Sequence, residues 1–276
     1  ALSGPNTVAR KLQLPGGNIE EIEDEVTWEA EQYLPFPVEE SALSFHAFGE
    51  NEGGGVDVLV CATKQDTLYN FRQLIEDAGL RVKIVDLGVV ALTNVFEHVV
   101  GRDIDEEGLD SWILFDMGAQ KTSMVVYKNK KIAFAKEMTI GGVMITEEIQ
   151  RQMGVNYNEA EDLKTTRDEN GNLPEEILEI VDDVVEAFFA EIKKSVDFYV
   201  SSSQDEGIVG CYFTGGGVEV PGLVEGLEAL LGVEVSVLNP FDTVEYDEKN
   251  FSKSMIRSIS TKGVGAIGLA MRKFKS

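Results

Sequence analysis

Two glycine-containing turns carry the residue types that hold a nucleotide. The first follows an apolar run and reads Asp116-Met117-Gly118-Ala119-Gln120-Lys121-Thr122, and the second reads Thr214-Gly215-Gly216-Gly217. Glycine allows a sharp turn and brings backbone N–H groups close to a phosphate or sugar. A carboxylate at a strand end, such as Asp116, can hold magnesium through water. One such turn is typical of ordinary hairpins, but two in this order indicate a nucleotide site.

Length, charge and composition limit the class of protein. The chain has 276 residues, of which 43% are hydrophobic, and a formal net charge of −25. This length suggests about two domains. The negative charge argues against nucleic-acid binding, which needs clustered Lys and Arg. No apolar run approaches the roughly 20 residues that span a bilayer, so direct membrane insertion is not expected.

Few residues favour a metal or disulfide site. Cys61 and Cys211 lie far apart without a CxxC pattern, which indicates two buried thiols. Two histidines, His46 and His98, argue against a histidine metal site. The acidic stretch from residue 103 begins like a calcium loop, but Leu114 stands where a bidentate Glu is required. We interpret residues 103–110 as an acidic linker between two domains.

Hydrophobic periodicity predicts alternating strands and helices, and therefore an α/β protein. In the first half, strands are expected at 7–14, 56–62 and 82–87, and helices at 19–33, 68–78 and 90–96. In the second half, strands are expected at 122–127, 131–137, 207–213 and 233–238, and helices at 141–153, 177–199 and 223–230. The small-residue segment 263–270 can be helical only if it packs closely on a neighbour, because each Gly disfavours a helix.

These residues together resemble the actin-like ATPase superfamily, and within it the PilM family of type IV pilus assembly proteins, which are relatives of FtsA. The superfamily resemblance rests on the Asp116 turn, the Gly215-Gly216-Gly217 turn and the segment 263–270. The features similar to PilM are residues 29–37, 140–147 and 160–164. The resemblance covers nearly the whole chain.

The resemblance implies an actin-like fold of two ribonuclease H-like domains with an FtsA-type inserted subdomain. The first domain is expected at 1–110, with the inserted subdomain at about 8–84, and the second at 111–276, with a terminal helix that returns toward the first. The family's first phosphate loop is expected before Ala1. Part of the first domain is therefore expected to be missing, which leaves tight triphosphate binding by this chain in question.

The resemblance also implies ATP or ADP with magnesium as ligands. Asp116 would hold magnesium through water, and Glu161 and Lys164, on one helix face, would touch ribose and base. The turn glycines would pass beneath the adenosine. The full set implied by the resemblance is Asp116, Gly118, Ala119, Gln120, Lys121, Thr122, Gly141, Gly142, Glu161, Lys164, Gly215, Gly216 and Gly217.

Each of these roles has a plainer alternative. Gln120 orients a water or is simply a polar turn residue. Lys121 supplies charge to the phosphates or is a solvated turn residue. Glu161 and Lys164 bind the nucleotide or form a surface ion pair. Ala119 and Gln120 leave no evident general base, so weak or no ATPase turnover is expected.

The partner implied by the resemblance is the N-terminal cytoplasmic segment of PilN, an inner-membrane protein. It would lie extended in a groove of the inserted subdomain, near Tyr33, Leu34, Pro35 and Phe36. These residues alternatively close the edge of a core.

The expected function is a cytoplasmic ATP-binding scaffold, held at the inner membrane by its partner beside other pilus-machine components, with self-association left open. The competing class is an FtsA-like cell-division protein or another actin-fold ATPase or kinase. No acceptor-site general base supports a kinase, and the last residues, 271–276, are too short to anchor alone.

Overall fold

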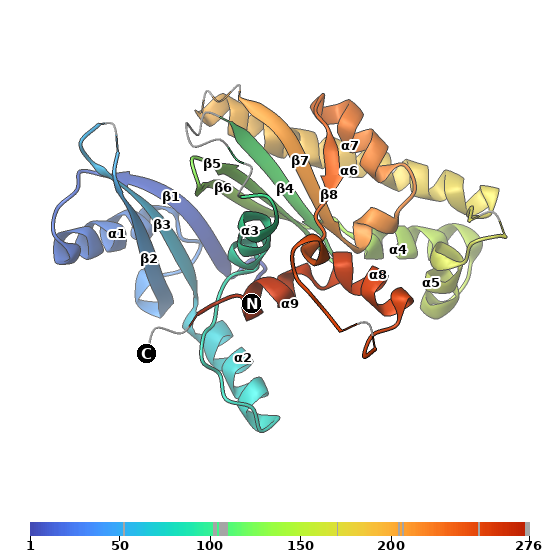
Figure 1. The fold of residues 1–276 in the computed structure, drawn as a ribbon, viewed down its shortest axis with the longest axis horizontal. Helices are drawn as coiled ribbons and strands as arrows, with labels where there is room; N and C mark the ends of the chain where they lie inside the picture. Colours follow the sequence, from blue (N-terminus) through green and yellow to red (C-terminus); the bar gives the residue numbers. More distant parts are fainter. Residues whose placement is uncertain are drawn as a thin grey trace.

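The computed structural model describes residues 1–51, 53–101, 104, 110–169, 171–203, 205, 207–247 and 249–273, and its strands form two sheets (Figure 1). The first sheet is antiparallel, in the order β1-β3-β2, with β1 at Thr7–Leu14, β2 at Ser41–Glu50 and β3 at Val56–Lys64. The second has the order β6-β5-β4-β7-β8. Its strands are β4 (Ser111–Met117), β5 (Thr122–Lys128), β6 (Lys131–Met138), β7 (Ile208–Gly215) and β8 (Val235–Val237).

Helix α1 (Ile19–Tyr33) covers one face of the three-stranded sheet. It begins at a capping box between Asn18 and Glu21 and ends before Pro35, as the sequence predicts. Its buried residues pack on the side chains of β1 and β3 that point to this face; the buried set is Leu14, Ile22, Val26, Val56, Val58 and Val60. The short helix η1 (Val38–Glu40) then leads into β2.

The prediction of a strand at 82–87 is wrong. After α2 (Gln65–Asp77), this segment runs extended, and its strand pairing in the described residues is one parallel bridge between Leu2 and Leu87. A strand needs a neighbour for its backbone hydrogen bonds. The longest of the elements that were not predicted are β2 and α8 (Lys253–Lys262). The predicted linker lies outside the described residues except for Ile104 and Asp110.

Helices cover both faces of the five-stranded sheet (Figure 1). One face packs against α4 (Gly142–Met153), α5 (Tyr157–Thr165), α6 (Glu175–Ser203) and α7 (Leu223–Leu231), around a core with Phe115, Phe188 and Phe213. The other face packs against α3 (Gly88–Val99), where Phe96, Leu114 and Tyr127 are buried together. Leu59 of β3 joins this second core, so α3 lies between the two sheets.

The small-residue segment forms α9 (Val264–Ala270), and it packs closely on α3. A β-carbon on Gly268 would overlap the carbonyl oxygen of Ala91, and Asn94 Nδ2 donates to the Gly268 carbonyl at 3.2 Å. This contact is the close packing that the sequence requires for a helix here.

A charged cluster joins the two sheets. Asp57 of β3 contacts Lys11 of β1 at 2.8 Å and Lys131 of β6 at 3.2 Å. Lys131 follows the β5–β6 hairpin tip, where Asn129 and Lys130 have φ values of 54° and 58°. Such left-handed pairs form tight hairpin turns, which fix the register of the two strands. The turn therefore sets the position at which Lys131 meets Asp57.

Candidate functional site

The two glycine turns lie side by side because β4 and β7 are parallel neighbours. Asp116 is in register with Thr214, and Met117 with Gly215. Both strands therefore end at the same edge of the sheet, where parallel sheets commonly place a ligand. The short helix η2 (Gly216–Glu219) continues from the second turn.

The three glycines of the second turn have different surroundings. Gly215 has a φ of 87°, and a β-carbon there would overlap the Met117 carbonyl oxygen and lie 2.6 Å from Asp116 Oδ1. A β-carbon on Gly217 would lie 2.7 Å from the Met117 side chain. For Gly216 the nearest atom is Lys262 Cε at 3.9 Å. The fold therefore requires Gly215 and Gly217 but leaves Gly216 room for a side chain.

Asp116 is a half-buried carboxylate at the end of β4. Burial raises its pKa, and the nearby positive charge of Lys121 partly counters this effect. In the described part of the chain, the Asp116 side chain makes no hydrogen bond. Magnesium is usually held by one or two carboxylates together with phosphates and waters, so a single carboxylate fits this ion. The described residues contain no cluster of three or more His, Cys, Asp or Glu that could hold a metal alone.

The first turn is held from behind by the start of α4. The N–H groups of Gly142 and Val143 donate to the carbonyls of Gly118 and Ala119, at 3.1 and 2.8 Å. Gly118 N–H donates to the Lys121 carbonyl at 2.9 Å, so this N–H is engaged within the turn rather than free for a phosphate. The buried Thr122 hydroxyl donates to the Ile140 carbonyl at 2.8 Å. Gly118, Thr122 and Gly142 therefore shape the turn through its internal bonds.

Gln120 and Lys121 border a cleft of about 690 Å³ that also contacts the start of the chain and Gly88. The Lys121 ammonium lies 2.9 Å from Glu137 Oε1, and Glu137 also accepts from the Gly4 N–H. Lys121 is thus an ion-paired residue of the cleft wall. Gln120 is exposed at the tip of the turn.

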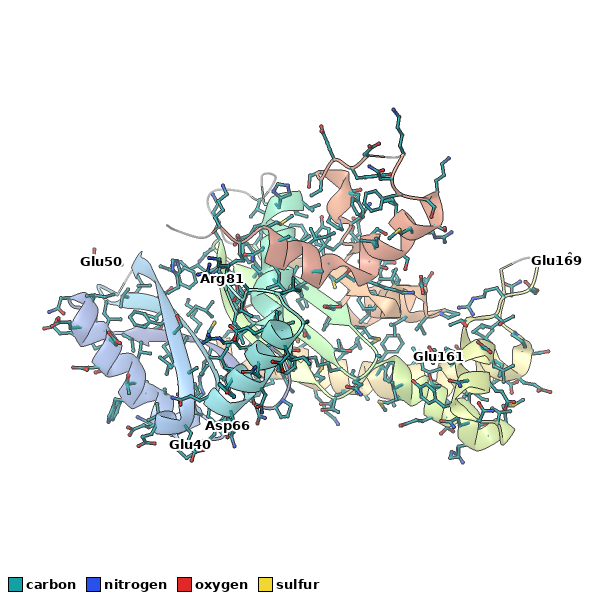
Figure 2. The ribbon with its side chains drawn as sticks, turned by 90° about the horizontal axis from the view of Figure 1, so that it is seen from below. Glu40, Glu50, Asp66, Arg81, Glu161 and Glu169 are labelled. Atoms are coloured by element: carbon teal, nitrogen blue, oxygen red, sulfur yellow. The ribbon has the colours of Figure 1, made fainter. Side chains whose placement is uncertain are left out.

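Glu161 and Lys164 lie on α5 and form an ion pair of 2.6 Å; Figure 2 shows Glu161 on this helix. Lys164 Nζ also donates to the Thr146 hydroxyl at 2.7 Å and to the Gly142 carbonyl at 3.2 Å. Burial raises the pKa of Glu161, but hydrogen bonds from Lys164 and Thr146 outweigh it and leave the pKa below its ordinary value. The carboxylate is therefore ionised at neutral pH.

Sequence reasoning missed Lys262, Glu219 and Thr146. Lys262 Nζ pairs with Glu219 Oε2 at 2.7 Å beside Gly216, and the Lys262 charge also acts on Glu161. Lys262 thus lies beside the second turn, and its positive charge favours the ionised form of Glu161. It was missed because α8, which carries it, was not predicted. Thr146 sits in the apolar spacing of α4 and gives no distinct signal.

The four residues predicted to bind the partner lie at the end of α1. Tyr33 stacks under Arg10, whose Cζ is 4.5 Å from the ring centroid, and burial raises the pKa of Tyr33 to about 12. Phe36 is buried, with Lys64 Nζ 5.9 Å from its ring centroid. Leu34 and Pro35 form the turn between them. These residues lie on the α1 face of the three-stranded sheet.

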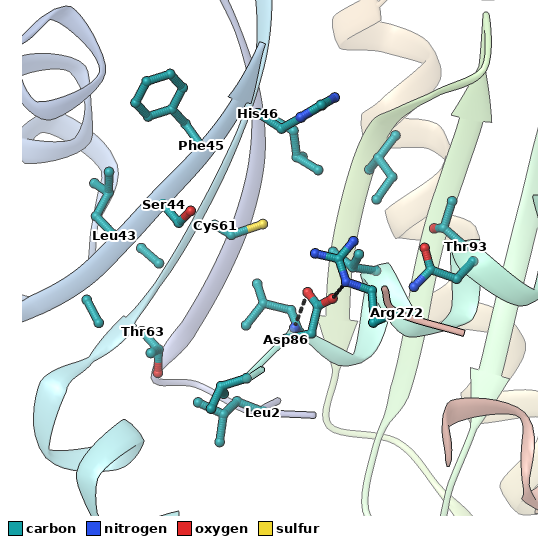
Figure 3. Close-up of a pocket in the computed structure, with 18 of the residues that line it drawn as sticks. Leu2, Leu43, Ser44, Phe45, His46, Cys61, Thr63, Asp86, Thr93 and Arg272 are labelled. Carbon is teal, nitrogen blue, oxygen red and sulfur yellow. Dashed lines mark hydrogen bonds and ion pairs between the residues drawn. The ribbon is translucent and has the colours of Figure 1, made fainter. Parts of the chain in front are cut away.

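A cavity of about 620 Å³ opens on the opposite face of this sheet, between β2, β3 and α3. In Figure 3, Cys61 points into it and Phe45 points away, while Asp86 and Arg272 form an ion pair of 2.9 Å on the far wall. The apolar lining includes Phe48, Leu59, Leu87, Val90 and Ile132. Among the described strands, β2 pairs with β3 alone, so its other edge is open beside the cavity. The predicted residues Tyr33 to Phe36 do not line this cavity.

The sequence profile of the family "Type IV pilus assembly protein PilM" matches residues 1–274. The chain belongs to the PilM family. A solved PilM–PilN type IV pilus biogenesis complex is similar to it, with 28% identity and a TM-score of 0.83 over 97% of this chain and 76% of that one. The ethanolamine utilization protein EutJ of Carboxydothermus hydrogenoformans shares the fold, with 20% identity and a TM-score of 0.52 over 91% of this chain and 72% of that one.

The cell division protein FtsA of Enterococcus hirae is 25% identical over 195 residues, which are 63% of this chain and 42% of FtsA. FtsA of Enterococcus faecalis gives 24% identity over the same share. The chain thus spans less than half the length of these curated relatives. The prediction of an actin-like α/β fold of the PilM and FtsA type is confirmed. No helix among the described residues has the length and apolarity needed to cross a membrane.

Proposed function

We propose that this PilM-family protein is an ATP-binding scaffold of the type IV pilus inner-membrane platform, with little or no turnover, that docks the N-terminal cytoplasmic segment of PilN. In this proposal residues 1–110 belong to the first actin-like domain and 111–276 to the second. The observation that carries nucleotide binding is the meeting of a half-buried carboxylate, Asp116, with a glycine turn that has open space at Gly216.

In the proposed complex, the nucleotide would lie across both glycine turns. Adenosine would pass over Gly216, close to Lys262, and the phosphates would meet the Asp116 turn. Magnesium, when bound with ATP, would supply positive charge beside the half-buried Asp116 carboxylate. Asp116 would hold it through water, while α4 keeps the turn in shape from behind.

Substitution of Gly216 is the direct test. Because the protein itself leaves room at Gly216, Gly216→Ala and Gly216→Val should fold normally but clash with adenosine. We expect ATP affinity to fall at least tenfold for Val and less for Ala, measured by isothermal titration with magnesium and ATP. Thermal melting should be unchanged.

The neighbouring glycine provides the control. Gly217→Ala should lower the melting temperature, because its β-carbon would meet the Met117 side chain at 2.7 Å. Normal ATP affinity of the folded Gly216→Val protein would contradict the proposed position of adenosine at this turn.

Partner binding is supported by the open edge of β2 beside the apolar cavity. An extended segment can add to a strand edge through main-chain hydrogen bonds, while its apolar side chains fill a pocket. The cavity of about 620 Å³ offers such a pocket. The similar solved structure is a PilM–PilN complex, which supports PilN as the partner.

A peptide of the PilN N-terminal segment from the same organism tests this docking. Val90 lies on the cavity wall, so Val90→Arg should weaken peptide binding about tenfold or more, or 1.4 kcal/mol per decade, as measured by fluorescence anisotropy. Thr27→Arg, on the α1 face, is the matched control and should leave affinity unchanged.

If Thr27→Arg weakened peptide binding and Val90→Arg did not, the PilN segment would instead bind on the α1 face, beside Tyr33 and Phe36. Absence of binding to the unaltered, folded chain would contradict PilN docking altogether.

A further inference from the structure

Arg272 brings a positive charge to the wall of the apolar cavity. It follows α9 and lies beside Asp86, on the far wall from β2 and β3 (Figure 3). Its Nε lies 2.9 Å from Asp86 Oδ2, and its side chain is 45% exposed. Within the described ranges, neither of its terminal nitrogens, Nη1 and Nη2, donates a hydrogen bond. The guanidinium therefore has unused N–H donors at the cavity.

Asp86 holds this guanidinium in place. The Asp86 side chain is 10% exposed, and its Oδ1 accepts from the Leu87 N–H at 2.9 Å. Its Oδ2 is buried and has no hydrogen-bond partner among the residues that the structure describes, so the charge of Arg272 compensates it. Asp86 precedes α3 and Arg272 follows α9, and these two helices pack closely. Their packing therefore fixes where the two charges meet.

An extended segment added to the open edge of β2 needs donors on its other side. A strand that pairs on one side leaves a row of N–H and C=O groups unpaired on the other. Inside an apolar cavity such groups are costly unless they are hydrogen-bonded. On the far wall, the Thr93 hydroxyl and the Asn94 amide already donate to the carbonyls of Val89 and Gly268. Of these three side chains, Arg272 has the most donors to spare.

We propose that Arg272 recognises a main-chain carbonyl of the docked segment through Nη1 or Nη2, and that Asp86 is the residue that positions it. This inference rests on the proposed PilN docking and names the group that fixes the segment against the far wall. A carbonyl suits this wall better than a carboxylate, because Asp86 already balances the charge of Arg272 and Glu97 adds a further acidic group to the lining. The segment would thus be held between β2 and the end of α9.

A double-mutant cycle between the protein and the peptide backbone tests this contact. PilN-segment peptides with one backbone amide at a time replaced by an ester are titrated into the unaltered chain and Arg272→Met by fluorescence anisotropy. Arg272→Met should bind the all-amide peptide about tenfold more weakly, as expected for the loss of a hydrogen bond to a charged group. An ester carbonyl is a weaker acceptor than an amide carbonyl. One ester should therefore weaken binding to the unaltered chain but not to Arg272→Met.

Further variants separate recognition from a structural role. Arg272→Lys keeps the charge beside Asp86 but replaces the planar fork by a single ammonium, so it should reduce the dependence on that ester. Asp86→Asn should also reduce this dependence, because it releases Arg272 from its ion pair. The exposed Lys273→Met is the matched control and should bind every peptide as the unaltered chain does.

The double variant Asp86→Asn/Arg272→Met removes both charges and takes the place of Arg272→Met in the cycle if the single variant melts early. Unaltered affinity of folded Arg272→Met, or the absence of any ester whose effect depends on Arg272, would overturn the inference. A loss at Arg272→Met that largely disappears at high salt would do so too, because it would indicate an exposed charge pair with a peptide carboxylate. If the unaltered, folded chain does not bind the all-amide peptide, the proposed PilN docking itself fails.

Discussion

Asp116 is a half-buried carboxylate, and its partial burial disfavours the negative charge. Its neighbours include the Lys121 ammonium, which is itself ion-paired with Glu137 at 2.9 Å. Single residues with this character can be predicted from sequence when they end an apolar run, as Asp116 does. The pairing of Lys164 with Glu161 could be predicted from their spacing on one helix face. Glu137 as partner of Lys121 and Thr146 as second partner of Lys164 could not, because they lie on other elements. Lys121 and Lys164 are therefore the residues whose predicted roles depend most on tertiary contacts.

Asp116→Asn should stabilise the nucleotide-free protein at pH 7 while weakening binding of magnesium and ATP. Burial raises the pKa of Asp116, so its ionised form costs stability above that pKa. The melting temperature should rise by about 2–4 °C, the shift that 1 kcal/mol gives in domains of 150–250 residues. The gain should disappear as the pH falls toward the ordinary value of 3.8. A lower melting temperature at pH 7 would contradict the assigned cost of burial.

Helix α9 illustrates how much an element depends on its neighbour. Its small residues predict a helix only in close contact with another element, and α3 supplies that contact at Ala91. Elements with strong periodicity, such as α1 and α6, could be predicted with nearly correct bounds. The segment 82–87 could not, because its apolar composition describes a strand but not the neighbour that a strand requires. Strand β2 contains Ser, His and Gly, which hide its alternation.

Two alanine substitutions within α9 separate packing from helix propensity. Gly268→Ala would place a β-carbon on the Ala91 carbonyl oxygen, and we expect a loss of about 1–3 kcal/mol in the free energy of unfolding. Gly265→Ala meets no atom within 4 Å and should instead gain up to about 1 kcal/mol. Denaturant unfolding measures both. Equal effects of the two substitutions would rule out the α3–α9 contact.

At the scale of the whole molecule, the Asp57 cluster fixes the three-stranded sheet against the hairpin of the other sheet. The Asp57 side chain is 7% exposed. It forms ion pairs with Lys11 and Lys131 and accepts a hydrogen bond from the Asn51 amide. Lys131 also lies 5.4 Å from the Phe48 ring centroid and lines the cavity. The alternating elements of the sequence predict an α/β fold, and its length predicts about two domains. The relative placement of the sheets cannot be predicted, because it depends on long-range contacts such as this charge cluster and the core around α3.

Asp57→Asn should destabilise the protein by about 1–3 kcal/mol, because it leaves two ammonium groups without their counter-charge. Burial alone would raise the pKa of Asp57, but hydrogen bonds from Lys11, Lys131 and Asn51 lower it below 3.8. Its contribution is therefore present above pH 3.8 and is lost as the pH falls through the lowered pKa. Chemical unfolding at pH 7 and pH 3 tests this, with the exposed Asp24→Asn as control. An equal loss at both pH values would contradict the charge-based explanation.

The unequal surroundings of Gly215, Gly216 and Gly217 have a consequence for mutational tolerance. Substitutions at Gly215 and Gly217 disturb the backbone and the Met117 side chain, so cells should contain less of such variants whatever they bind. If the proposed nucleotide function holds, substitutions at Gly216 should leave protein abundance intact and reduce only function in pilus assembly. A saturation library scored separately for abundance and for piliation would therefore split one short motif into two classes of constraint. Of the three glycines, only Gly216 would be constrained by ligand binding rather than by folding.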